Sequence, residues 1–267
     1  MKRILAAIAI AFGLFSRIPM PLVEWSRSNM RYALAAMPFV GLVQGFCAVV
    51  WGLAAAWLGL SAPLVAAGLL AIPFAVNGGI HLDGLADTAD ARSSHAERAR
   101  KLEIMADPHI GAFGVIAVVL HLIALFAVLL SFPTHDVCAL AVLPGLYGLS
   151  RCLSAFAVAT WPAAKDNGIV RTMSDDAAPR VVPTVLCVFA TVCAVWMVVW
   201  GRLAAVIAVV AALLVFVRYR HMAMHEFGGT SGDLAGWFLQ MVELAMLTAF
   251  VIAGPLFERL ALGGALL

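Results

Sequence analysis

Three aspartates are spaced four and then three residues apart in the segment 77–90, which reads Asn-Gly-Gly-Ile-His-Leu-Asp-Gly-Leu-Ala-Asp-Thr-Ala-Asp. On an α-helix, Asp83, Asp87 and Asp90 fall within an arc of roughly 60°. Like charges on one face repel one another, so something should compensate them. Mg²⁺ prefers carboxylate and water oxygens and commonly also holds substrate phosphate. The spacing therefore predicts a magnesium site, and the alternative is a solvated, acidic helix end.

Two further groups of polar residues are candidates for the same chemistry. Asp107 precedes Pro108, so it is either the N-cap of the next helix or a further carboxylate for a metal or a hydroxyl group. Arg98 and Arg100 lie just before it and are suited to holding phosphate, although membrane topology also explains them. His81 lies roughly opposite the aspartate face, where we expect an interfacial residue or one that supports substrate binding.

A glycine-rich turn precedes the last apolar run. Such a turn before a helix presents backbone N–H groups to an anion, which makes Gly228, Gly229, Gly232 and Asp233 candidates for phosphate binding; a flexible loop capped by Asp233 is the alternative. Glu243 lies inside the apolar run, where an ionisable group indicates a function or a specific partner. Arg17 and Arg151 could each reach a phosphate or extend to the membrane surface.

The elements that position these residues are predicted to be membrane helices. Apolar residues make up 64% of the 267 residues and charged residues 12%, which excludes a water-soluble globular fold. Continuous apolar runs without alternation predict helices rather than a barrel. We expect an all-α integral membrane protein with one polytopic domain over 1–267 and about seven spans, near 34–58, 63–80, 111–132, 137–159, 183–200, 203–217 and 237–256.

The distribution of charge predicts how these spans are oriented. Lys and Arg are concentrated in the long loops between spans two and three, four and five, and six and seven, which places those loops and the site in the cytoplasm. The apolar segment after Lys2 and Arg3 resembles a secretory signal, but Arg17, Pro19 and Pro21 favour a retained interfacial helix. The five cysteines show no metal-ligand spacing and are expected to be packing residues.

These motifs are similar to those of bacterial cobalamin synthase, also called adenosylcobinamide-GDP ribazoletransferase. Its Gly-Gly-x-His-Leu-Asp-Gly-Leu-Ala-Asp-Thr-x-Asp signature matches residues 78–90, its basic segment resembles 98–114, and its glycine turn resembles 228–233. The Arg-x-Pro-x-Pro at 17–21 also matches. The sequence departs from the family pattern at Ala91 and Gln240, and at His225 and Glu226, which replace a more basic stretch.

The resemblance implies condensation of adenosylcobinamide-GDP with α-ribazole or its 5′-phosphate, with Mg²⁺ and release of GMP. It implies metal binding by Asp83, Asp87 and Asp90, with one of these or Asp107 as general base, and phosphate binding by Arg98, Arg100 and the glycine turn. We expect a multi-pass protein of the bacterial inner membrane, with the lipid bilayer and small molecules as partners, no nucleic acid, and a homo-oligomer left open. The alternatives are a CDP-alcohol phosphotransferase and a cation transporter.

Overall fold

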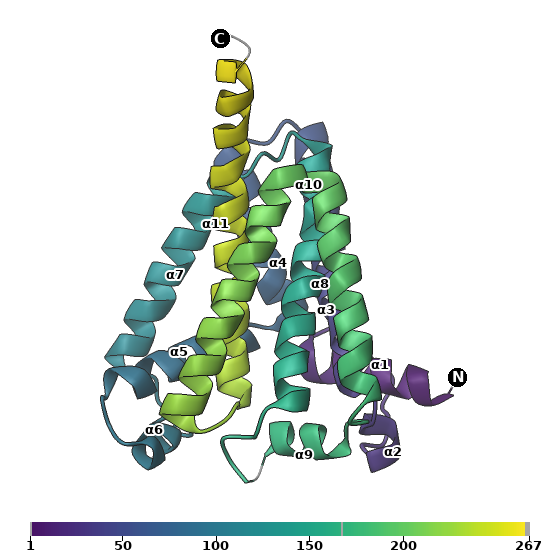
Figure 1. The fold of residues 1–267 in the computed structure, drawn as a ribbon, viewed down its shortest axis with the longest axis vertical. Coiled ribbons are helices and arrows are strands. Elements are labelled where there is room, and N and C mark those ends of the chain that lie inside the picture. Colours follow the sequence, from purple (N-terminus) through teal and green to yellow (C-terminus); the bar gives the residue numbers. More distant parts are fainter. Residues whose placement is uncertain (1, 167, 265–267) are drawn as a thin grey trace.

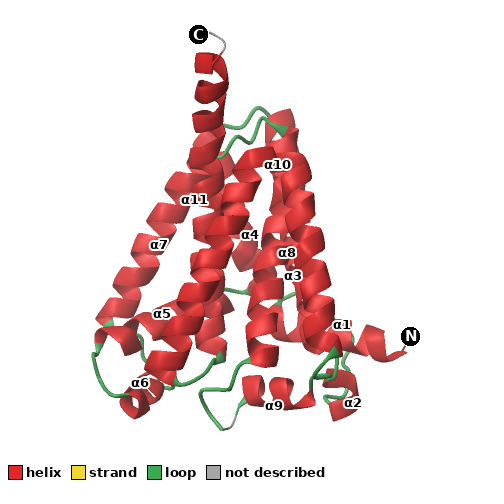
Figure 2. Cartoon of the chain, in the orientation of Figure 1, coloured by secondary structure: helices red, strands yellow, loops and turns green. Residues whose placement is uncertain are grey.

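The fold is a helical bundle. The computed structural model describes residues 2–166 and 168–264, and in these ranges the regular structure is helical (Figure 2). One isolated bridge pairs Ala163 with Thr230. The elements are α1 (Lys2–Phe15), α2 (Arg27–Met30), α3 (Ala33–Trp57), α4 (Ala62–Asn77), α5 (Ile80–Ser93), α6 (Arg98–Ile104), α7 (Ala112–Leu130), α8 (Val137–Thr160), α9 (Ile169–Asp176), α10 (Val181–Met222), the π-helix η1 (Ala223–Phe227) and α11 (Gly232–Gly264). The predicted all-α class is confirmed.

Five helical stretches of the described chain are long and apolar enough to cross a membrane. They are α3, α7, α8, the continuous stretch of α10 and η1, and Gly232–Gly254 of α11. The pair α4 and α5 is a sixth candidate only when the two helices are taken together across a bend. Helices α3, α7 and α8 begin and end within two residues of the predicted spans, because a continuous apolar run is what lipid requires of a helix.

Helix α10 replaces two predicted spans. Its backbone leaves the helical region at Arg202, with φ 50° and ψ −135°. The legs 181–201 and 203–222 run antiparallel, and Figure 1 shows the turn between them at the end of the bundle opposite α5, α6 and α9. The second leg therefore brings the chain back to the end of the bundle at which the first leg began. We call this the acidic end, because α5 lies there.

The acidic helix is separated from the preceding apolar helix by two consecutive glycines in the left-handed conformation. Gly78 has φ 71° and Gly79 has φ 84°, and the side-chain oxygen of Asn77 accepts a hydrogen bond from the backbone N–H of Gly79 at 3.0 Å. Glycine adopts such angles without steric cost. The result is a bend of 93° between α4 and α5. Helix α5 therefore lies across the bundle (Figure 1) and is too polar to cross a bilayer itself.

Helix α8 lies at the centre of the bundle and α7 at its periphery. Leu140, Leu143 and Leu146 of α8 are almost fully buried, and α8 packs against α3, α10 and α11. Leu120 and Ile123 of α7 are each 61% exposed, which is expected of apolar side chains that face lipid. Helix α1 lies across the long axis of the bundle and packs against α3 (Figure 1).

Candidate active site

The acidic helix α5 is held against the first turn of α11 by close backbone contact. A Cβ atom at Gly84 would lie 2.5 Å from the carbonyl oxygen of Asp233, so only glycine lets the two helices approach this closely. Gly236, one turn further along α11, faces the backbone of His81. This packing brings Asp83 and Asp87 of α5 close to Asp233, and so joins two motifs that are 150 residues apart in the sequence.

The carboxylates at this junction carry uncompensated negative charge. Burial is the largest cause of a raised pKa at Asp87, which reaches about 7. The carboxylates of Asp83 and Asp233 add to the shift, and the ammonium group of Lys165 opposes it. No ion pair in the described part of the chain includes Asp83, Asp87 or Asp233. Across the described ranges no three acidic, histidine or cysteine side chains converge closely enough to bind a metal by themselves.

Asp90, the third aspartate of the motif, has partners of its own. Its two carboxylate oxygens accept hydrogen bonds from the backbone N–H groups of Gly111, at 2.7 Å, and Gly114, at 2.8 Å. These groups belong to the N-terminus of α7, which otherwise lacks acceptors. A Cβ atom at either glycine would lie 2.4 Å from the carboxylate. Asp90 therefore anchors the start of a spanning helix, whatever else it binds.

The expectation that Asp107 caps the next helix is wrong. Helix α7 begins at Ala112, and Gly111 is its N-cap residue. Asp107 lies in the preceding loop, where its carboxylate accepts hydrogen bonds from the backbone and ring of His109. Asp107 and Asp90 line a separate surface hollow of about 450 Å³, together with Arg100. The structure therefore places Asp107 and Arg100 apart from the cavities that Asp83 and Asp233 line.

The basic segment meets the glycine turn through Glu226. Arg92 donates hydrogen bonds to this carboxylate at 3.1 to 3.2 Å, and Lys101 donates one at 2.9 Å. Glu226 is one of the two residues that depart from the family's basic stretch, and here it ties α5 and α6 to η1. Arg98 lies directly beside Gly228, because its guanidinium occupies the space where a side chain at that position would be.

The glycine turn is ordered by backbone hydrogen bonds rather than open to an anion along its whole length. The N–H groups of Gly228 and Gly229 donate to the carbonyl of Ala223, and that of Thr230 donates to Pro162. The side chain of Ser231 accepts a hydrogen bond from the N–H of Leu234 and so caps α11. The alternative interpretation of this turn, a loop capped by Asp233, is therefore wrong.

Two adjoining cavities open beside Asp233. The first has a volume of about 250 Å³, and Asp83, His81 and mostly apolar side chains line it. The second, of about 200 Å³, is lined by Lys165, Arg171 and the residues from Thr230 to Asp233, among others. Ile169, Val170, Gly232 and Asp233 line both cavities. Lys165 was not among the predicted site residues. The only sequence signal for its place in the site is that it belongs to a basic loop.

Arg17 lies where α4 meets α5. Its backbone N–H donates to the carbonyl of Val76 at 2.7 Å, and its side chain lies against Gly78. The exposed guanidinium is therefore near the N-terminus of the acidic helix. His81, predicted to lie opposite the aspartate face, lines the same cavity as Asp83, because both residues belong to the first turn of α5 after the bend.

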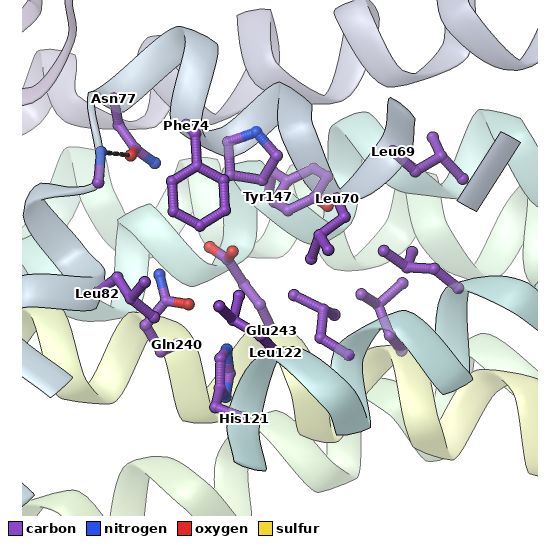
Figure 3. A pocket seen from close by; sticks show the side chains of 15 residues that line it. Leu69, Leu70, Phe74, Asn77, Leu82, His121, Leu122, Tyr147, Gln240 and Glu243 are labelled. Carbon is purple, nitrogen blue, oxygen red and sulfur yellow. Dashed lines mark hydrogen bonds between the residues drawn. The ribbon is translucent and has the colours of Figure 1, made fainter. Parts of the chain in front are cut away.

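Arg151 and Glu243 form a buried ion pair between α8 and α11. Arg151 is 1% exposed, and its guanidinium donates to Glu243, to Ser150 and, at 2.9 Å, to the side-chain oxygen of Gln44. The expectation that Arg151 reaches a phosphate or the membrane surface is wrong, since its contacts lie inside the bundle. The expected partner of Glu243 is confirmed. Figure 3 shows Glu243 between Tyr147 and His121, beside a small cavity of about 20 Å³.

The fold and the site define a helical membrane protein in which an acidic helix, a glycine turn and a cationic loop meet at one end of the bundle. The family described as cobalamin-5-phosphate synthase has a model that matches residues 7–251, and the chain belongs to this family. The resemblance found in the sequence motifs is therefore confirmed.

Curated relatives match over nearly the whole chain. An adenosylcobinamide-GDP ribazoletransferase of Lachnoclostridium phytofermentans is 37% identical over 249 residues, which cover 93% of this chain and 94% of that protein. A protein with the same name from Ectopseudomonas mendocina is 36% identical, over 91% of this chain and 98% of that protein. Another, from Pseudomonas fluorescens, is 34% identical, over 82% of this chain and 88% of that protein. No solved structure matches the chain.

Proposed function

We propose that the chain is an adenosylcobinamide-GDP ribazoletransferase, the activity for which its relatives are named. The reaction joins adenosylcobinamide-GDP to α-ribazole or its 5′-phosphate, and it completes the nucleotide loop of cobalamin. The observation that carries this proposal is the junction of α5 with α11, where Asp83 and Asp87 lie close to Asp233 and Lys165.

The chemistry is the transfer of a substituted phosphate group. A ribose hydroxyl oxygen of the acceptor forms a new bond to phosphorus, the bond from that phosphorus to the GMP oxygen breaks, and the hydroxyl proton passes to a base. We assign Lys165, Arg171 and the N-terminus of α11 to the diphosphate, because these groups line one cavity. Arg98 lies beside Gly228 of the glycine turn and is a further candidate cation. Asp233 lines both cavities and Asp83 lines the first, so both carboxylates are candidates for the base.

The residues present fit a bound Mg²⁺. No ion pair of the described chain includes Asp83, Asp87 or Asp233, and the carboxylates of Asp83 and Asp233 help to raise the pKa of Asp87. Mg²⁺ usually keeps several waters and binds through one or two carboxylates plus substrate phosphates, so a closed protein cage is not required. When bound there, the ion would withdraw charge from the diphosphate as the phosphorus–oxygen bond breaks. Asp90 remains a candidate ligand, but its two carboxylate oxygens also accept the hydrogen bonds that anchor α7.

We also propose the topology that charge and fold together support. Helices α3, α4, α7, α8, α11 and each leg of α10 would cross the inner membrane as one domain of seven spans, with α1 at the interface. The cations between the spans lie at the acidic end, whereas Arg202 lies at the other, so the acidic end would face the cytoplasm. Single cysteines at Ser94 and Thr134, in a chain without its native cysteines, should be labelled from the cytoplasmic and outer sides respectively. Labelling of both from one side would contradict this topology.

The decisive test is turnover by the purified protein in lipid. With adenosylcobinamide-GDP, α-ribazole and Mg²⁺, GMP should be released, and a chelator should abolish its release. Asp83→Asn and Asp87→Asn should each remove most of this activity while the protein stays folded in detergent, because each substitution removes charge from the proposed metal site. Glu103→Gln is the matched control, since its carboxylate is exposed and pairs only with Arg100. Wild-type turnover in both Asp variants would refute the assignment.

A further inference from the structure

The apolar cavity beside Asp83 has properties that the phosphate chemistry does not explain. Its walls are formed mainly by apolar side chains of α1, α3, α8, α9 and α11, among them Leu34, Val158, Met173 and Leu239. A phosphate or a free cation has no favourable contact with such walls. The two carboxylates, Asp83 and Asp233, belong to its lining as well. The occupant must therefore be apolar over most of its surface and polar on the part that meets the carboxylates.

Two buried polar atoms add a second, independent indication of a ligand. Ser154 is fully buried and His81 is 5% exposed, and both residues line this cavity. The hydroxyl oxygen of Ser154 and the ring nitrogen Nε2 of His81 find no hydrogen-bond partner among the described residues. Buried polar groups are rarely left in this state, because a buried donor or acceptor without a partner has lost its hydrogen bonds to water and gained none in exchange. A ligand with a hydrogen-bonding atom inside the cavity would satisfy at least one of them.

We propose that this cavity binds the base of the acceptor nucleoside, an inference that rests on the proposed function. The acceptor carries an apolar, fused two-ring aromatic base with one unsubstituted ring nitrogen, attached to a ribose. The base lies against the apolar walls, its ring nitrogen accepts a hydrogen bond from Ser154 or His81, and the ribose hydroxyl groups point toward Asp83 and Asp233. A volume of about 250 Å³ suits such a base and is far too small for a corrin macrocycle.

The position of the cavity agrees with the requirement for in-line transfer. The nucleoside cavity and the cationic cavity with Lys165 share Ile169, Val170, Gly232 and Asp233 as lining residues. A hydroxyl group at the edge of the first cavity is therefore next to a phosphate bound in the second. Asp233 lies between them, so it can both orient the hydroxyl and face the phosphorus-bearing group. Reaction requires that the two substrates meet in this geometry.

The first experiment fills the cavity. Ala235 lines it and is 8% exposed, and Ala204, also 8% exposed, lines a cavity at the other end of the bundle. Ala235→Leu should raise the KM for α-ribazole at least about tenfold, because the added side chain takes the space of the base. The KM for adenosylcobinamide-GDP should change much less, and Ala204→Leu should leave both constants near the wild-type values.

The second experiment tests the hydrogen bond and does not depend on tolerance of a larger side chain. Ser154→Ala and His81→Ala are each assayed with α-ribazole and with an analogue in which carbon replaces the unsubstituted ring nitrogen. At least one variant should lose roughly tenfold or more in kcat/KM with α-ribazole and little with the analogue. Equal losses with both nucleosides in both variants would overturn the proposed contact.

The outcomes separate this inference from the function on which it rests. If the wild-type protein releases no GMP, the proposed function fails. If it does release GMP but Ala235→Leu leaves the KM for α-ribazole unchanged, the assignment of the cavity fails and the function stands. A copurified lipid chain in the cavity that α-ribazole does not displace would also overturn the assignment. Thermal unfolding of each variant in detergent checks that the fold is intact.

Discussion

Asp87 lies where burial and three neighbouring carboxylates, those of Asp83, Asp233 and Asp90, all oppose its ionisation. The aspartates predicted to share one helical face therefore do concentrate negative charge. The two carboxylates that most raise the pKa of Asp87, however, belong to different helices. Asp83 is on the same helix, whereas Asp233 comes from the last helix. A helical periodicity argument finds the first and cannot find the second, because the contact depends on the approach of α5 to α11 at Gly84.

The raised pKa of Asp87 predicts how the metal-free protein responds to pH. The folded carboxyl group titrates near pH 7 and the unfolded one near its ordinary value of 3.8, so between these values the folded state binds more protons. Stability should therefore fall as the pH rises from about 4 to about 7. Unfolding temperatures measured in detergent with a chelator should show this fall in the wild type and a smaller one in Asp87→Asn. Identical pH profiles for the two proteins would contradict the prediction.

Lys165 is the cation that opposes the acidic cluster. Lys165→Met should raise the KM for adenosylcobinamide-GDP by roughly tenfold or more, because a cation that holds phosphate contributes about 1.5–3 kcal/mol per charged hydrogen bond. Steady-state GMP release measures this effect. Arg180→Met is the control, since Arg180 is an exposed cation of the same loop that lines none of the described site cavities. An equal effect of both substitutions would mean that only net charge matters.

At the scale of elements, the sequence predicts helices well and their junctions poorly. The spans at 34–58, 111–132 and 137–159 were predictable because lipid requires continuous apolar helices. The break of α10 at Arg202 was also indicated by the short interruption between two apolar runs. The anchoring of α7 by Asp90 was not predictable, because its partners Gly111 and Gly114 are 21 and 24 residues away and no local pattern specifies them.

The contact between Asp90 and α7 predicts a loss of stability that can be separated from loss of a metal ligand. Asp90→Ala removes both acceptors at the helix N-terminus and should cost about 0.5–2 kcal/mol in free energy of unfolding. Asp90→Asn keeps one acceptor oxygen and should cost less. Unfolding in detergent measures stability, and GMP release is assayed below the unfolding range. If Asp90→Asn is as stable as the wild type but inactive, the residue's main role is in the site.

At the scale of the whole molecule, three helices are held together by one buried polar network. Gln44 of α3, Arg151 of α8 and Glu243 of α11 are joined through the guanidinium of Arg151. The sequence indicates that Glu243 needs a partner but not which one, because the two residues are 92 positions apart. The network is buried, and it joins α3, α8 and α11.

Breaking this network on one side should be far more costly than removing it. Glu243→Leu leaves a buried, unpaired guanidinium and should cost about 3–5 kcal/mol, whereas Arg151→Met combined with Glu243→Leu should recover much of the loss. The stability of each variant is measured by its unfolding temperature and by the fraction of folded, monodisperse protein after extraction. A double variant less stable than Glu243→Leu alone would show that the pair is not the main interaction of either residue.

The turn of α10 at Arg202 has a consequence for how such a chain can change over evolution. Between α5 and α11 the polypeptide travels the length of the bundle along α7, α8 and the two legs of α10, an even number of passes. Because the number of passes is even, Gly232 lies at the same end of the bundle as Gly84. Loss or gain of a single pass would place Gly232 at the opposite end of the bundle from Gly84, so we expect only paired insertions or deletions to preserve the proposed site.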